Sequence, residues 1–261
     1  MDNLTDFISQ KRLFAFDLDG CVYTGDQPVP GVAEFIKRLE GQGARVVFVS
    51  NNSTHTGEQI SQKLAGFGVS TTPENIFHPA GFAGEFLKEQ GVGRVFVAGS
   101  RALLQNVEQA GAELCGTGET DCAAVLIGRD TDFTYARFEA ACRYIQRGAR
   151  FFVTNIDISH PSAGGVHVPE AGVFAAAIEQ VCGKKVEKSI GKPTAFLYNK
   201  LMEKNSLAAR DCVMLGDNPD TDIKGAANAG MDSIQLVMPG GFPKGAPTFW
   251  VDGFGRLIES L

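Results

Sequence analysis

Long apolar segments and dense basic clusters are both missing from this chain of 261 residues. No uninterrupted apolar run approaches the roughly 20 residues that a membrane-spanning helix needs. The stretch MDNLTDFISQKR is polar and mixed in charge, which is not the pattern of a secretory signal. The formal net charge is -6, and Lys and Arg form no basic stripe, which argues against a nucleic-acid or membrane-surface binder. We therefore expect a soluble, cytoplasmic protein with no nucleic-acid or membrane partner.

Paired cysteines and the common nucleotide-binding motifs are absent from the sequence as well. The six cysteines form no CxxC pair, and with the four histidines they give no zinc-finger spacing, so we expect reduced thiols. The segments GTGETD and GVGRVF lack the GxGxxG pattern, and GKPT lacks the upstream glycine of a P-loop. No GxSxG signature occurs. These absences argue against dinucleotide oxidoreductases, P-loop ATPases and serine hydrolases.

Short apolar segments alternate with helical patterns along the chain, and 44% of the residues are hydrophobic. The apolar segments hardly alternate with polar residues, which is typical of strands covered on both faces. They span residues 13–16, 45–49, 94–99, 123–128, 150–154, 212–216, 233–237 and 248–251. Helical patterns such as GVAEFIKRLEGQG, GEQISQKLAGFG and TAFLYNKLMEKN lie between them. This alternation predicts an α/β fold with a mostly parallel sheet.

The stretch from about residue 81 to residue 182 has strand and helix patterns of its own, including VFVAGSRALLQNVEQAGAEL. It contains few of the polar clusters that follow strand ends elsewhere in the chain. We interpret it as an inserted domain. The predicted organisation is therefore a core built from residues 1–80 and 183–261, with a second domain over residues 81–182.

Aspartates follow two of the predicted strands. Asp17 and Asp19 come after LFAF and are followed by Gly20, which permits a tight turn. Asp217 comes directly after CVMLG, with Asp220 and Asp222 close behind. Ligands of open α/β sheets collect beyond the carboxyl ends of the strands, so these acids are expected to converge. Oxygen ligands of this kind favour Mg²⁺ over zinc.

Two further segments supply groups that suit an anion. Ser50, Asn51 and Asn52 follow RVVFV and offer a hydroxyl and amides as neutral donors. Lys192, in SIGKPT, is predicted to lie at the start of a helix, where an ammonium and free backbone N–H groups act together on an anion. Next to a metal site, these donors indicate that the bound anion is a phosphate group.

The segments DLDGCVYTG, VSNNS, GKPT and GDNPDTD occur in this order along the chain. They resemble the four motifs of the haloacid dehalogenase-like (HAD) phosphatase superfamily. The order and spacing, with GDNPDTDIKGAANAG and the insertion before GKPT, are similar to the NagD and 4-nitrophenyl phosphatase subfamily. The resemblance covers nearly the whole chain. It implies a Rossmann-like core with a parallel sheet and an inserted α/β cap domain.

The resemblance also implies roles for individual residues. Asp17 would be the nucleophile that forms an aspartyl-phosphate, and Asp19 the acid and then the base. Cys21 is not expected to act as a nucleophile, since Asp17 fills that role. The proposed Mg²⁺ ligands are Asp17, the backbone carbonyl of Asp19, Asp217 and Asp222, with Asp220 left open between a ligand and a turn residue. The proposed phosphate-binding groups are Ser50, Asn51, Lys192 and the backbone amides near Leu18 and Asp19.

The segment FFVTNIDISHPSAGGVHVPEAG resembles the cap loop that faces the active site in relatives. Asn155 and Asp157 are therefore expected to face the substrate, whereas Ile156 and His160 depart from the family pattern. His160 and His167 are interpreted as polar loop residues rather than ligands.

The resemblance implies Mg²⁺-dependent hydrolysis of phosphomonoesters. The substrates are expected to be small, because a cap over the active site would obstruct a folded protein. Candidate substrates are nucleoside monophosphates, sugar phosphates, glycerol phosphate, phosphoglycolate and pyridoxal phosphate. The alternatives are a phosphotransferase or mutase on the same fold, or a non-catalytic protein that binds phosphate or metal. A dehalogenase is disfavoured, since it would need no acid at Asp19. Relatives that pair through their caps make a homodimer a further expectation.

Overall fold

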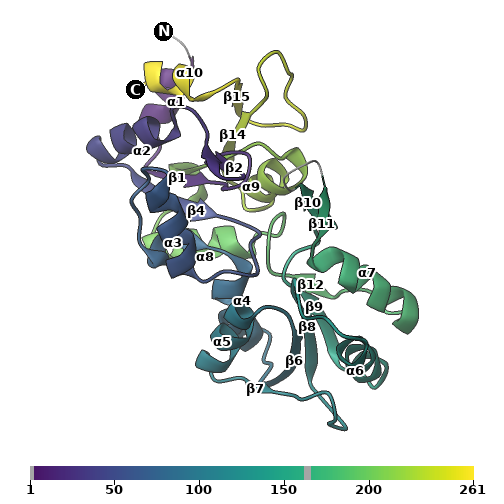
Figure 1. The fold of residues 1–261 in the computed structure, drawn as a ribbon. Coiled ribbons are helices and arrows are strands. Elements are labelled where there is room, and N and C mark those ends of the chain that lie inside the picture. Colours follow the sequence, from purple (N-terminus) through teal and green to yellow (C-terminus); the bar gives the residue numbers. More distant parts are fainter. Residues whose placement is uncertain (1–2, 162–165) are drawn as a thin grey trace. The chain divides into compact units, whose positions relative to one another are not determined.

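The computed structural model describes residues 3–161 and 166–261, and its parallel sheets with flanking helices confirm the predicted α/β class (Figure 1). The chain divides into two compact units. The first runs to Ser50 and also includes Gly57–Phe77 and Lys192–Leu261, and the second comprises Asn51–Thr56 and His78–Gly191. The segment 81–182 lies within the second unit. Over the described ranges, no helix has the length and apolar character needed to cross a membrane.

The first unit is built on a parallel sheet with the strand order β15-β14-β13-β1-β4-β5. Its strands are β1 (Leu13–Phe16), β4 (Arg45–Val49), β5 (Ile76–Phe77), β13 (Cys212–Gly216), β14 (Asp232–Leu236) and β15 (Phe249–Val251). Every residue of β1 and β13 is buried, as their unalternating apolar sequences predict.

Helices cover this sheet and complete its core. Phe14 and Phe16 of β1 contact Phe35 of α2 (Val32–Gly41), and Phe16 also stacks on Phe254 of α10 (Phe254–Glu259). The helix α8 (Phe196–Asn205) contacts β4 and β5, and α9 (Lys224–Asn228) contacts β14. Further α-helices and hairpin strands of this unit are α1 (Asn3–Ser9), α3 (Gly57–Gly66), β2 (Tyr23–Thr24) and β3 (Gln27–Pro28).

The second unit has its own parallel sheet, in the order β12-β9-β8-β6-β7. Its strands are β6 (Arg94–Ala98), β7 (Glu113–Leu114), β8 (Ala124–Ile127), β9 (Arg150–Val153) and β12 (Lys188–Ser189). Its helices are α4 (Pro79–Glu89), α5 (Arg101–Gln109), α6 (Tyr135–Gln146) and α7 (Ala171–Cys182). The strands β10 (Ser159–Pro161) and β11 (His167–Pro169) pair antiparallel. Phe96 and Tyr144, which lie 5.4 Å apart between ring centroids, belong to its core.

The register of the first sheet aligns three strand ends. Phe16, the last residue of β1, pairs with Leu215 of β13 on one side and with Phe48 of β4 on the other. The residues that follow these strands therefore emerge at the same edge of the sheet. They are Asp17 after β1, Ser50 after β4 and Asp217 after β13.

Candidate active site

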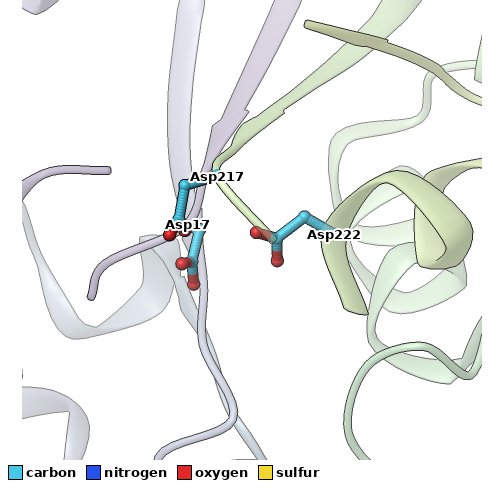
Figure 2. Close-up of side chains that lie close together, drawn as sticks. All are labelled: Asp17, Asp217 and Asp222. Carbon is cyan, nitrogen blue, oxygen red and sulfur yellow. The ribbon is translucent and has the colours of Figure 1, made fainter. Parts of the chain in front are cut away.

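Three carboxylates converge at the carboxyl ends of β1 and β13 (Figure 2). Asp17, Asp217 and Asp222 each offer a carboxylate oxygen, and these three atoms lie within 4.8 Å of one another. Asp17 and Asp222 are buried, whereas Asp217 is exposed. The structure thus brings together the three carboxylates predicted to hold a metal, and the fourth predicted ligand, at Asp19, is a backbone carbonyl.

The turn after β1 leaves room for this cluster. Gly20 has a φ of +91°, a conformation that side chains rarely adopt, and a Cβ there would collide with the Asp217 carboxylate. The side chain of Asp19 is exposed and accepts a hydrogen bond from the Tyr23 hydroxyl at 3.3 Å. Asp19 is therefore oriented by Tyr23, and within the described ranges its carboxylate is not one of the three clustered groups.

The turn after β13 is held by its own hydrogen bonds. The backbone N–H of Asn218 donates to Asp222 Oδ2 at 3.1 Å, and the Asn218 side chain accepts from the N–H groups of Asp220 and Thr221. Asp220 is exposed, and its backbone takes part in this turn. A Cβ at Gly216 would collide with the carboxylate of Asp222. The glycine and the Asn218 cap together set the position of Asp222, which lies on the short helix η4 (Pro219–Ile223).

Lys192 neutralises part of the cluster. Its ammonium, in a residue only 2% exposed, donates to Asp17 Oδ1 at 2.5 Å, to Asp222 Oδ1 at 2.7 Å and to the Val49 carbonyl at 3.1 Å. The sequence-based prediction put Lys192 at a helix start. That detail was wrong, because α8 begins at Phe196, and the three acceptors hold Lys192 instead of a helix N-terminus.

Burial, and then the excess of negative charge, raise the pKa values of Asp17 and Asp217. Burial, and then the charge of Asp222, raise the pKa of Asp17 well above its usual value, against the opposing effect of Lys192. The Asp217 carboxylate packs against the Gly20 turn and is partly desolvated there. This desolvation, and then the negative charge of Asp222, raise the pKa of Asp217 to about 6. Burial lowers the pKa of Lys192, but its two carboxylate partners outweigh that effect and raise it. A divalent cation would relieve this repulsion.

The donor set fits magnesium. The clustered ligand atoms are all carboxylate oxygens, which a hard cation prefers. Cys21 lies nearby but is fully buried, and burial raises the pKa of its thiol while its Sγ donates to the Leu215 carbonyl at 3.5 Å. A thiol kept protonated in this way is a poor metal ligand and a poor nucleophile. The site therefore suits a hard divalent cation.

The other predicted phosphate-binding groups of the first unit lie in the loops that follow β1 and β4. Leu18 is fully buried between Asp17 and Asp19, and its carbonyl accepts from the N–H groups of Val22 and Tyr23. Ser50 is buried, and its N–H donates to the Phe77 carbonyl at 3.0 Å. These bonds fix the two loops that follow β1 and β4.

Asn51, Asn155 and Asp157 belong to the second unit, where they form a hydrogen-bonded group. Asn51 donates from its side chain to Asp157 Oδ2 at 2.9 Å, and Asn155 donates from its side chain to the Asn51 carbonyl at 2.9 Å. The Asp157 N–H donates to Asn155 Oδ1 at 3.1 Å. The structure thus joins a predicted phosphate-binding residue to the two predicted substrate-facing residues.

His160 lies on β10 and His167 on β11 of the second unit. His160 Nδ1 lies 2.7 Å from Glu170 Oε1, and His167 Nδ1 lies 3.2 Å from the Ser159 hydroxyl. Arg129 is also within 3.4 Å of Glu170 Oε1. Both histidines therefore have polar partners within their own unit.

Asn218 is a residue of the site that the sequence-based analysis missed. Its role follows from the sequence Asn-Pro-Asp-Thr-Asp, because an Asn before Pro readily caps the turn that follows. The sequence-based prediction named only the aspartates of this segment.

Two family models match the chain. One described as haloacid dehalogenase-like hydrolase matches residues 14–113, and one described as HAD-hydrolase-like matches residues 189–246. The matched ranges include the acids of both turns and Lys192.

Known proteins are similar to this chain over most of their length. The chain is 31% identical to 5'-nucleotidase YutF of Bacillus subtilis, over 85% of each protein. It is also 31% identical to acid sugar phosphatase of Staphylococcus aureus, over 88% of this chain and 87% of that protein. Its fold resembles the crystal structure of 4-nitrophenylphosphatase from Thermotoga maritima, with a TM-score of 0.89, 30% identity and coverage of 97% and 98% of the two chains.

Proposed function

Because this chain belongs to the haloacid dehalogenase-like hydrolase family and is a phosphatase, we propose that it hydrolyses small phosphomonoesters with Mg²⁺ and through an aspartyl-phosphate. The observation that carries the proposal is the cluster of Asp17, Asp217 and Asp222 with Lys192 bonded to two of its members. Three carboxylates against one ammonium leave an excess of negative charge that a divalent cation balances.

The residues proposed to hold the ion are Asp17, the backbone carbonyl of Asp19, Asp217 and Asp222, the last directly or through water. Their oxygens match the ligand preference of Mg²⁺. Bound there, the ion would neutralise the approach of an anionic phosphate to an anionic carboxylate and stabilise charge on the transferring oxygens.

Asp17 is proposed as the nucleophile. Lys192 bonds its Oδ1, which fixes the carboxylate and leaves Oδ2 as the oxygen that attacks phosphorus. The attack forms a bond from Asp17 to phosphorus while the bond to the leaving oxygen breaks. Lys192 then supplies its positive charge to the phosphate oxygens, together with the Ser50 hydroxyl, the Asn51 amide and the backbone N–H groups of Leu18 and Asp19.

Asp19 is proposed as the general acid and base. Its carboxylate is exposed, so it can reach a substrate oxygen, and the Tyr23 hydroxyl orients it. In the first step, Asp19 gives a proton to the leaving oxygen. In the second, it takes a proton from the water that attacks the aspartyl-phosphate, which returns Asp17 and releases phosphate.

The proposed substrates are small molecules. The names of two relatives, a 5'-nucleotidase and an acid sugar phosphatase, favour nucleoside monophosphates and sugar phosphates among the candidates. We further propose that the segment 81–182 acts as the cap and that Asn155 and Asp157 contact the leaving group. A panel that adds glycerol phosphate, phosphoglycolate and pyridoxal phosphate, read by phosphate release, ranks these substrates by kcat/KM.

The proposal is tested with metal-stripped protein and 4-nitrophenyl phosphate. Wild-type protein should release 4-nitrophenol only after Mg²⁺ is added, and Asp17→Asn should lose about 10³-fold or more in rate, since the nucleophile is removed. Asp26→Asn, an exposed acid in the turn between β2 and β3, is the matched control and should keep wild-type activity. Turnover without any divalent metal would contradict the proposal.

The same experiment separates the alternatives. A phosphotransferase or mutase would move phosphate to an added alcohol or sugar with little release to water. A regulatory protein would bind Mg²⁺ or phosphate without turnover. A cytoplasmic location and a homodimer formed through the segment 81–182 are further proposals, which cell fractionation and light scattering would test.

A further inference from the structure

Gln235 is a buried amide on β14 that no catalytic motif includes. It is 3% exposed and pairs in register with Gly216, the last residue of β13. Its side chain therefore lies beside the strand end from which Asp217 emerges. A buried amide needs partners for its oxygen and its nitrogen, and those partners show what it does.

The two ends of the Gln235 amide bind two different loops. Its Nε2 donates to the backbone carbonyl of Asp217 at 3.1 Å. Its Oε1 accepts from the backbone N–H of Lys244 at 3.0 Å. A carbonyl acceptor on one side and an N–H donor on the other fix the orientation of the amide, because the reverse orientation would place like groups together.

The bond to Asp217 helps to hold one peptide group in the turn that follows β13, which we call the metal turn. The carbonyl of Asp217 is bound by Gln235, and the N–H of the same peptide, that of Asn218, is bound by Asp222 Oδ2. Rotation of this peptide would break both bonds. The peptide lies between two of the clustered acids, so its orientation helps to set where their carboxylates point.

The bond to Lys244 anchors the segment between β14 and β15. The two large apolar side chains of this segment, Met238 and Phe242, are 81% and 82% exposed, so they do not fasten it to the sheet. Backbone contacts remain, among them the one from Lys244 to Gln235. Close approach at Gly245, where a Cβ would lie 3.5 Å from Pro219, also places this segment against η4.

We propose that Gln235 is a positioning residue for the metal site, which fixes the Asp217 turn and ties the segment 237–248 to it. This inference rests on the proposed function, because it assumes that the acidic cluster binds Mg²⁺. Without the amide, the Asp217 carbonyl loses its partner and the metal turn samples other orientations, which weakens metal binding. Removal of a group that orients a metal ligand without binding the metal itself commonly weakens metal affinity by about 10-fold or more.

The test compares Gln235→Met with Ser233→Ala by calorimetric titration of Mg²⁺ into metal-stripped protein. Met has a similar length and cannot make either hydrogen bond. Ser233 is a matched control, because it is buried on the same strand and two residues away, on the same face. Gln235→Met should raise the Mg²⁺ dissociation constant about 10-fold and leave kcat at saturating Mg²⁺ within about twofold. Ser233→Ala should change neither quantity.

Two further variants separate the two bonds and guard against misfolding. Lys244→Pro removes the N–H that binds Gln235 and leaves the bond to the Asp217 carbonyl in place, so it should make the segment 237–248 sensitive to proteases and change Mg²⁺ affinity less than Gln235→Met does. Gln235→Asn keeps a polar amide that is too short to span both partners, and it should also weaken Mg²⁺ binding if the Met variant does not fold.

The outcomes distinguish the two proposals. If wild-type protein binds no Mg²⁺, the proposed function fails. If wild-type protein binds Mg²⁺ and a folded Gln235 variant binds it equally well, the positioning role is overturned while the proposed function stands. Equal effects of the Gln235 and Ser233 variants would also overturn the positioning role.

Discussion

The desolvation of Asp217 and its repulsion by Asp222 predict that Asp217→Asn makes the metal-free protein more stable. The pKa of Asp217 is raised from 3.8 to about 6 by desolvation and by Asp222. A shift of about 2 units corresponds to about 3 kcal/mol. Because Asp217 is exposed, solvent screening reduces this figure, and we expect about 1–2 kcal/mol. The amide carries no charge and removes this cost.

The pH dependence follows from the direction of the shift. An acid whose pKa is raised on folding is held protonated more tightly by the folded state, so its ionisation costs stability. For Asp217 that cost is absent below about pH 4, grows as the pH rises toward about 6 and is complete above it. The advantage of Asp217→Asn should therefore be full at pH 7 and should vanish near pH 4.

The assay is urea unfolding with a chelator present, repeated with Mg²⁺ added. Mg²⁺ should stabilise the wild-type protein, since a ligand of the folded state shifts the unfolding equilibrium, and should stabilise Asp217→Asn much less. Asp26→Asn, outside the cluster, serves as the control and should behave as wild-type. The reasoning is refuted if metal-free Asp217→Asn is less stable than wild-type at pH 7, or if Mg²⁺ stabilises both equally.

Three further variants test other parts of the site. Asp19→Asn should slow hydrolysis of 4-nitrophenyl phosphate by about 10²–10⁴-fold, the usual contribution of general acid–base catalysis, with Mg²⁺ affinity by calorimetry nearly unchanged; an undiminished rate would disprove its role. Lys192→Met leaves two buried carboxylates without their ammonium, so it should lower the free energy of unfolding in urea by about 3–5 kcal/mol. Lys37→Met, at an exposed position, should lower it by less than about 1 kcal/mol. Gly20→Ala introduces a Cβ that collides with the Asp217 carboxylate, so it should weaken Mg²⁺ binding in a calorimetric titration, and unchanged affinity would contradict that geometry.

The long elements and the acidic strand ends could be predicted from the sequence because their signals are local. The strands 13–16, 45–49 and 212–216 coincide with β1, β4 and β13. A strand that is buried on both faces gives a continuous apolar run wherever it lies in the sheet. Once such a strand is predicted, an aspartate that follows it is placed at the strand end without further information. The convergence of Asp17 and Asp217 follows from the parallel arrangement of those strands.

Elements of two residues gave no such signal. The strands β5, β7 and β12 are too short for any periodicity, and only their pairing with β4, β6 and β9 defines them. The start of α8 was misplaced because Thr194 and Ala195 continue the helical pattern in composition without being part of the helix. Local composition does not determine where such short or terminal segments pair.

Groups that act through contacts distant in the sequence were also missed. Gln235 reads as an ordinary strand residue, and its two partners lie 18 and 9 residues away on separate loops. The Val49 carbonyl that binds Lys192 lies 143 residues away. The sequence thus indicated charged groups that the structure brings together, whereas the neutral groups that hold them in place became apparent only in the folded chain.

The central claim is that the acidic cluster supports transfer of phosphate to Asp17. The most direct test is to quench the enzyme during turnover of 4-nitrophenyl phosphate, reduce it with borohydride, and identify the altered residue by peptide mass spectrometry. An aspartyl-phosphate is reduced to homoserine, and we expect this change at Asp17, only when Mg²⁺ is present. A change at another residue, or turnover with an unaltered Asp17 under conditions that trap acyl phosphates, would contradict the claim.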